Sequence, residues 1–181
     1  MDGKSGGYQA ICLSTFGIPA MRNTGHKKHK NSHAREVALQ ALYQMEVADQ
    51  PLYRVLELGW LNEPMDPSAG EYCRFLIQGV VDHWDALNRV LESYSDKDVT
   101  QISTVNRCIL RLGFFELMQS SLSPDIVMDD LLNLTRKYEG NEAVSFVNGI
   151  LDRFEADRFE DFKSNGGTES LSGPFPPNGL N

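Results

Sequence analysis

The residues with the clearest chemistry lie in one basic stretch near the N-terminus, HKKHKNSH, at positions 26–33. Its three histidines are spaced by three and four residues, a spacing that would place their imidazoles on one helical face for a metal ion. The interleaved lysines would repel a dication, and Gly25 and Asn31 disfavour a helix at this point. We therefore predict no metal site there.

The lysines of this stretch leave two interpretations open. Lys27, Lys28 and Lys30 form either a solvated basic tail or an arm that pairs with phosphates and folds against RNA on binding. Composition alone does not choose between the two.

The other polar residues show no catalytic pattern. The sequence has no Cys-x-x-Cys, no GxGxxG and no Walker A motif, so we predict no enzyme, no cofactor and no catalytic residue. Asp129 and Asp130 are expected on the solvated face of a helix. His83, beside Trp84 on an apolar stripe, is expected to be a hydrogen-bonded core or boundary histidine.

The first half of the chain has helical spacing of apolar residues. A helix capped by Ser32 is expected to end before Pro51, and a short helix is expected from there to Leu58. The capping box Ser68-x-x-Glu71 then predicts one long helix that continues for six turns to Tyr94.

The second half is also helical. Apolar residues on nearly every face from Val105 to Met118 predict a helix at the centre of a bundle. Ser123-Pro124 begins the next helix, Gly140 ends it, and a last helix follows Asn141. No segment alternates with a period of two, so the predicted fold class is all-α, one compact bundle of six or seven helices.

Three further positions carry structural expectations. Gly149, inside the last helix, predicts either a close helix contact or a backbone that a ligand approaches, with Asn148 hydrogen-bonding across that contact. Arg107 and Arg111 are one turn apart on the central helix. They either extend a basic surface or pair with acids of a neighbouring helix.

Charge is unevenly distributed along the 181 residues, whose formal net charge is −8. Up to residue 35 there are six basic residues and one acidic residue, whereas the remaining 146 residues carry 11 bases and 24 acids, a net charge of −13. Cys12, Cys73 and Cys108 are odd in number and widely spaced, which indicates reduced thiols and a cytoplasmic protein. An acidic body with a basic arm is compatible with a nucleic-acid partner.

Three blocks of sequence, in order, resemble the NusB family of bacterial transcription antitermination factors. AREVALQALYQMEV (34–47) is similar to the opening helix of the family, VNRCILRLGFFEL (105–117) to its central helix, and FVNGILD (146–152) to the signature of its last helix. The resemblance implies a two-lobed helical bundle. It also implies binding of single-stranded boxA RNA, together with the small-subunit ribosomal protein NusE, on RNA polymerase with other Nus factors, in support of ribosomal RNA transcription.

The resemblance also assigns site residues. It places the RNA-binding motif of the family on the five residues Lys27, Lys28, Lys30, His33 and Arg35, and its RNA-contacting aromatic on Phe146. Tyr43 and Tyr94 fall on tyrosines of the partner-protein face, and Asn106 stands where that face usually has an acid. Lysines and histidines replace the consecutive arginines of the family, which removes bidentate guanidinium contacts and predicts weaker or more pH-dependent RNA binding.

The expected organisation is a disordered basic extension at 1–30, a NusB-like RNA-binding domain at 31–162 and a disordered tail at 163–181. Two alternatives remain to the antitermination factor. One is an RNA-binding domain related to ribosomal-RNA cytosine methyltransferases, and the other is a helical adaptor that binds only protein.

Overall fold

The computed structural model describes the backbone of residues 27–164 and the side chains of residues 31–158. In this part of the chain it contains seven α-helices and one short 3-10 helix: α1 (Lys27–Ala48), α2 (Leu52–Leu56), α3 (Pro67–Asp82), α4 (Trp84–Tyr94), η2 (Val99–Gln101), α5 (Thr104–Gln119), α6 (Pro124–Glu139) and α7 (Asn141–Ser164). The described residues include no strand, which confirms the all-α prediction.

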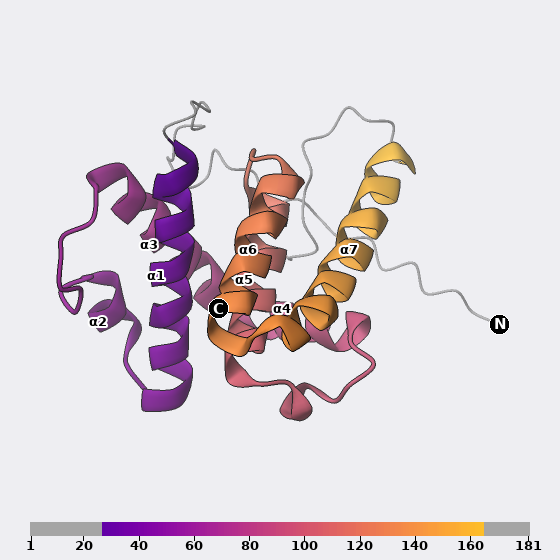
Figure 1. Cartoon of the computed structure of the whole chain (residues 1–181), viewed down its shortest axis with the longest axis horizontal. Coiled ribbons are helices and arrows are strands. Elements are labelled where there is room, and N and C mark those ends of the chain that lie inside the picture. The colour runs from indigo at the N-terminus through magenta and orange to yellow at the C-terminus, as the bar shows by residue number, and fades with distance from the viewer. Residues whose placement is uncertain (1–26, 165–181) are drawn as a thin grey trace, which may run out of the picture.

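The helices form two groups around α5. Helices α1, α2 and α3 lie on one side and α4, α6 and α7 on the other, as Figure 1 shows. Helix α5 packs against α1, α3, α4, α6 and α7. The two-lobed bundle implied by the resemblance is therefore present.

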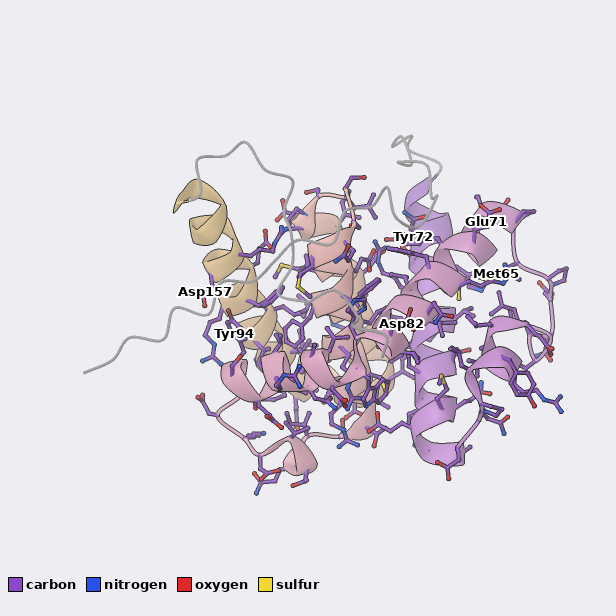
Figure 2. The ribbon with its side chains drawn as sticks, turned by 180° about the vertical axis from the view of Figure 1, so that it is seen from behind. Met65, Glu71, Tyr72, Asp82, Tyr94 and Asp157 are labelled. Carbon is purple, nitrogen blue, oxygen red and sulfur yellow. The ribbon has the colours of Figure 1, made fainter. Side chains whose placement is uncertain are left out.

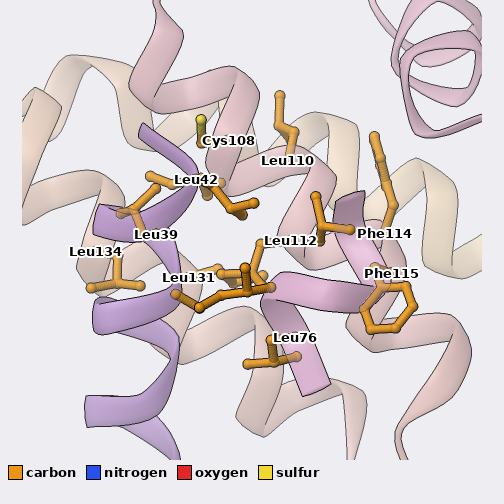
Figure 3. Close-up of a cluster of buried hydrophobic side chains, with 14 of the residues drawn as sticks. Leu39, Leu42, Leu76, Cys108, Leu110, Leu112, Phe114, Phe115, Leu131 and Leu134 are labelled. Atoms are coloured by element: carbon orange, nitrogen blue, oxygen red, sulfur yellow. The ribbon is translucent and has the colours of Figure 1, made fainter. Parts of the chain in front are cut away.

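The core surrounds α5, whose residues are buried without interruption from Cys108 to Met118. Leucines of α1, α3 and α6 meet α5 in this core (Figure 3). Two glycines permit the closest helix contacts. A Cβ at Gly79 would lie 1.8 Å from the ring of Phe115, and one at Gly113 would lie 2.8 Å from Leu131. Any larger residue would push α3 or α6 away from α5.

The long helix expected up to Tyr94 is two helices, which corrects that prediction. His83 ends α3 with φ −115° and ψ 18°, and its Nδ1 donates to the carbonyl oxygen of Gly79 at 2.7 Å. The next helix starts at once, because the amide of Leu87 donates to the carbonyl of His83 at 2.9 Å. A one-residue break leaves the apolar spacing nearly unchanged, so the spacing could not reveal it. His83 is a half-buried, hydrogen-bonded boundary residue, as expected.

Helix starts differ in two places from the expectation. Asp66, rather than Ser68, caps α3, since its Oδ1 accepts from the amides of Ser68 (3.1 Å) and Ala69 (3.4 Å). Helix α1 begins at Lys27, so Ser32 lies inside the helix instead of at its N-cap. In the predicted disordered segments 1–30 and 163–181, residues 27–30 and 163–164 are helical, and the others lie outside the described residues.

Candidate nucleic-acid interface

The basic arm, defined as Lys27, Lys28, Lys30 and His33, occupies the first two turns of α1. The side chain of His33 is exposed. The side chains of the three lysines lie outside the described part of the structure, although their backbone belongs to the helix. The helix that Asn31 was expected to disfavour is therefore formed through this stretch.

Arg35 is not part of an exposed interface, which corrects its assignment to RNA. Its side chain is 0% exposed, and its guanidinium donates to both carboxylate oxygens of Glu116, from Nε at 2.8 Å to Oε2 and from Nη2 at 2.6 Å to Oε1. Its Nη1 forms a further ion pair with Asp130. The guanidinium of Arg35 is therefore paired with carboxylates inside the bundle, where an RNA phosphate cannot reach it.

Five residues from four helices form this buried cluster, which we call the Arg35 network: Ser32, Arg35, Tyr72, Glu116 and Asp130. The hydroxyl of Tyr72 donates to Glu116, and the hydroxyl of Ser32 donates to Asp130 at 2.6 Å. Burial alone would lower the pKa of Arg35, but the Glu116 carboxylate raises it above its ordinary value. Burial and the same carboxylate raise the pKa of Tyr72, so its phenol stays protonated and remains a donor.

Asp130 was expected on a solvated face, and this is wrong, because it is 7% exposed and paired with Arg35. Its neighbour Asp129 is exposed, as expected. The sequence predicts the pair on the polar side of α6 but does not reveal that a cation on α1 is buried against Asp130. The one feature of the sequence that hints at this buried ion pair is the position of Arg35 at the edge of an apolar stripe.

A second ionic cluster joins the other end of α1 to α5. Glu46 accepts from Arg107 (Nη2 at 2.5 Å) and from Arg111 (Nη1 at 2.6 Å), so the arginines pair with an acid instead of extending a basic surface. Arg111 also lies over the ring of Trp84, with its Cζ 4.0 Å from the centroid. Cys108 adds a thiol that donates to Glu46, and burial raises its pKa to about 12.

Phe146 lies half-buried near the start of α7, with a cation beside its ring. The ammonium of Lys97 is 4.7 Å from the centroid of the Phe146 ring. Gly149 follows one turn later on α7 and is exposed, and a Cβ there would meet no atom within 4 Å. The close helix contact predicted for Gly149 is therefore absent, and Asn148 bonds along its own helix to Asp152. The alternative, a backbone open to a ligand, remains.

The three residues predicted for the partner protein differ in their surroundings. Tyr43 is 39% exposed on α1, whereas Asn106 is 7% exposed at the start of α5. Within the described residues, the buried Oδ1 of Asn106 has no hydrogen-bond partner. Tyr94 packs on Phe114 and Phe154, and its hydroxyl donates to Asp157 of α7 at 2.9 Å.

The residues predicted to bind RNA and the partner protein do not share one surface. Figure 2 shows Tyr94 beside Asp157, on the side of the bundle away from α1. Figure 1 likewise separates the first turns of α1 from the first turns of α7, which lie toward opposite ends of the bundle. The basic arm and the Phe146 region, defined as Phe146, Lys97 and Gly149, are therefore two separate candidate contact areas.

Two other kinds of site are not found in the described part of the chain. Among the described side chains, no group of three His, Cys, Asp or Glu residues is placed to hold a metal ion. His26 and His29, which the spacing argument included, lie outside those side chains. Over the described residues, no helix has the length and apolar character needed to cross a membrane.

Comparison with known proteins supplies the family. The family model described as the NusB family matches residues 32–156. The chain is 33% identical over 122 residues to the transcription antitermination protein NusB of Leptospira biflexa, covering 66% of this chain and 87% of that protein. It is 34% identical to the protein of the same name from Myxococcus xanthus, covering 66% of this chain and 89% of that protein.

Solved structures agree with the sequence comparison. T. maritima NusB matches with a TM-score of 0.65 and 27% identity, over 76% of this chain and 94% of that chain. A crystal structure of the antitermination factors NusB and NusE in complex with dsRNA matches with a TM-score of 0.60 and 26% identity, over 72% of this chain and 98% of that chain. The seven described helices with α5 buried among them, the matched family model and these relatives lead to one conclusion: the chain belongs to the NusB family of transcription antitermination proteins.

Proposed function

We propose that this protein is a cytoplasmic, non-enzymatic antitermination factor that binds boxA-type single-stranded RNA together with a NusE-type ribosomal protein. In this role it would tether nascent RNA to the elongating RNA polymerase with other Nus factors and support ribosomal RNA transcription. The observation that carries the proposal is the match to NusB proteins over 87% or more of their length, together with a related structure of NusB and NusE in complex with dsRNA, which supports an RNA partner. Both relatives are named as antitermination proteins, which favours the factor over a domain of a methyltransferase.

The basic arm supplies the phosphate contacts in this proposal. Lys27, Lys28 and Lys30 lie within four residues, on the only strongly basic segment of an otherwise acidic chain. Local positive charge of this kind supports binding to a polyanion despite a net charge of −8. Arg35 is left out of the interface because it is buried.

Phe146 supplies a stacking contact for an unpaired base. Its half-buried ring is anchored in the bundle, and the ammonium of Lys97 lies over the ring, so a stacking base would replace this ammonium, which would then pair with the phosphate of the nucleotide. Gly149 leaves open space one turn along the same helix, so a sugar or base can approach the backbone. An extended RNA strand would be needed to reach both this area and the basic arm.

The partner protein is proposed to dock on the Tyr43 and Asn106 end of α1 and α5. Tyr43 offers an exposed ring to such a partner, whereas Asn106 is 7% exposed with its Oδ1 buried, so Asn106 would support this surface from beneath. Arg107 bonds to Glu46, one turn beyond Tyr43, which places the two residues at the same end of the α1–α5 contact. Tyr94 is left to bundle packing because its hydroxyl is bonded to Asp157.

The experiment is a fluorescence anisotropy titration of a short boxA-type RNA and a scrambled RNA of equal length, with and without the NusE-type protein. We expect tighter binding to the boxA-type RNA, and a further gain in affinity when the partner is present. Equal or absent binding of both RNAs, with the partner still bound, would make the protein an adaptor for protein alone and would contradict the proposal.

A further inference from the structure

The Arg35 network meets α1 immediately behind the basic arm. Its two attachment points on α1 are Ser32 and Arg35, which are separated by one helical turn and face the same side. Ser32 is two residues from Lys30 and four from Lys28. Asp130 is central, because its Oδ2 accepts from both Ser32 and Arg35 and so connects both attachment points to α6.

The first turns of α1 are poor helix formers without this support. They contain no acidic residue, and basic side chains oppose the positive end of the helix dipole. Asn31 adds a residue of low helix propensity. A helix that is unfavourable by itself still extends from a turn that is already fixed, because each added residue then closes one hydrogen bond. The turn from Ser32 to Arg35 is such a fixed turn.

The charges of the two ionic clusters match the polarity of α1. In the Arg35 network one guanidinium faces the two carboxylates of Glu116 and Asp130, which leaves one net negative charge in the N-terminal half of the helix. At the other end, Glu46 faces the two guanidinium groups of Arg107 and Arg111, which leaves one net positive charge. Only the Arg35 network adjoins the arm. A substitution in the cluster around Glu46 therefore serves as a matched control for a substitution in the network.

We propose that the Arg35 network is a positioning device for RNA binding, in which Asp130 acts through Ser32 and Arg35 to keep the start of α1 helical and so fixes where the arm lysines lie. This role rests on the proposed function, since it concerns the same RNA-binding arm. None of the network residues touches RNA. Their effect on affinity runs through the order of the helix that carries the lysines.

The first test is amide hydrogen exchange of the whole chain without RNA, in the wild type and in Asp130→Asn and Glu46→Gln. Asp130→Asn is expected to speed exchange of the amides of residues 31–34, the first amides with hydrogen bonds inside α1, by about tenfold and to leave residues 43–48 unchanged, because local opening of one end of α1 needs no global unfolding. Glu46→Gln is expected to show the reverse pattern. Equal exchange at 31–34 in all three proteins would overturn the proposal.

The second test is anisotropy with the boxA-type RNA. Asp130→Asn should weaken binding by about fivefold at 0.1 M salt for each RNA phosphate that the arm no longer neutralises and should flatten the salt dependence, whereas Glu46→Gln should keep the wild-type slope. Ser32→Ala, which leaves every ion pair in place, should act in the same direction as Asp130→Asn, and Ser32→Thr should restore binding because it keeps the hydroxyl. If Asp130→Asn fails to fold, the Ser32 pair decides the question.

The two proposals fail in different ways. A wild-type protein that does not bind boxA-type RNA contradicts the proposed function, and with it the role of the network in binding. A wild-type protein that binds, with losses of affinity that are equal in Asp130→Asn and Glu46→Gln, contradicts only the positioning role. In that case the Arg35 network stabilises the bundle and does nothing more.

Discussion

The residue type of Arg35 predicts a contact with RNA, whereas its environment in the structure excludes one. The sequence shows an arginine next to a basic arm, which predicts a phosphate contact, but the structure places this guanidinium inside the bundle against Glu116 and Asp130. Helical spacing gives the face on which a residue lies only to within about one residue, and position 35 lies at the edge of the apolar stripe that starts at Ala34. Charge alone could not decide between the two surroundings.

Replacement of Arg35 by Met is expected to lower the free energy of unfolding by about 3–5 kcal/mol, because it leaves two buried carboxylates without their cation. Urea denaturation measures the change. Arg54→Met is the control, since Arg54 is exposed and its removal should change stability by less than about 0.5 kcal/mol. A loss below about 1 kcal/mol for Arg35→Met would contradict the role given to the network.

Glu46 predicts a dependence of stability on pH. Burial alone raises the pKa of this carboxyl group, but the hydrogen bonds from Arg107 and the charge of Arg111 lower it below its ordinary value of 4.5. The folded state therefore binds the proton less tightly than the unfolded chain. The stabilisation from Glu46 is complete above that ordinary pKa and is lost as the pH falls through the folded pKa.

The wild type should therefore lose more free energy of unfolding between pH 5.5 and pH 3 than Glu46→Gln, which has no carboxyl group to protonate at that site. Urea denaturation at a series of pH values checks this. Two curves that run parallel through this interval would show that Glu46 does not contribute.

Phe146→Leu is expected to weaken RNA binding by about 1–3 kcal/mol, because leucine keeps most of the apolar contact but offers no ring on which a base can stack. Phe75→Leu is the matched control, since Phe75 is also half-buried but packs on Tyr72 and Phe115. Anisotropy gives the affinities and thermal unfolding gives the stabilities. The stacking role is wrong if both variants lose the same affinity.

At the scale of helices, most of the fold could be predicted from spacing and caps. The central position of α5, the start of α6 after Ser123 and the end of α6 at Gly140 all agree with the sequence prediction. Gly140 has φ +87°, a backbone conformation that glycine adopts without strain. The break at His83 was missed, because it does not change the apolar period on which the prediction rested. The cap at Asp66 was missed because the Ser68-x-x-Glu71 box was preferred, although Asp66 followed by Pro67 is itself a helix-start signal.

The two helix glycines Gly79 and Gly149 should respond oppositely to alanine. Gly149→Ala is expected to raise the free energy of unfolding by about 0.5–1 kcal/mol, because the new Cβ meets open space and alanine is the better helix former. Gly79→Ala is expected to lower it, because its Cβ would overlap the ring of Phe115.

Chemical denaturation compares the two variants. Gly149→Ala should also bind RNA less well than the wild type although it is more stable, since the added methyl fills the approach beside Phe146. Unchanged RNA affinity in this variant would show that the open space at Gly149 is not used.

At the scale of the whole molecule, the site could be predicted only in part. The family, the helical scaffold and a basic arm followed from sequence, because each depends on short blocks whose order is preserved. The positions of the site residues relative to one another in the folded bundle could not be predicted. Helix packing decides that the arm at the start of α1 and the Phe146 region at the start of α7 lie toward opposite ends of the bundle, and that Tyr94 is turned toward Asp157 (Figures 1 and 2).

The arm lysines are proposed to neutralise RNA phosphates, and the salt dependence of boxA-type RNA binding tests this role most directly. The variant with Lys27, Lys28 and Lys30 replaced by Ala is compared with one in which the exposed Arg54, Arg74 and Arg89 are replaced by Ala. Each variant changes the formal net charge from −8 to −11, since three positive charges are removed. Any effect of net charge alone is therefore the same in both.

Each phosphate that a lysine neutralises adds about 0.7 to the magnitude of the slope of log K against log salt. The slope is therefore expected to fall in magnitude by about 2 in the lysine variant and to stay at the wild-type value in the arginine variant. Slopes that are equal in the two variants would contradict the role of the lysines, and the arm would then be a solvated tail.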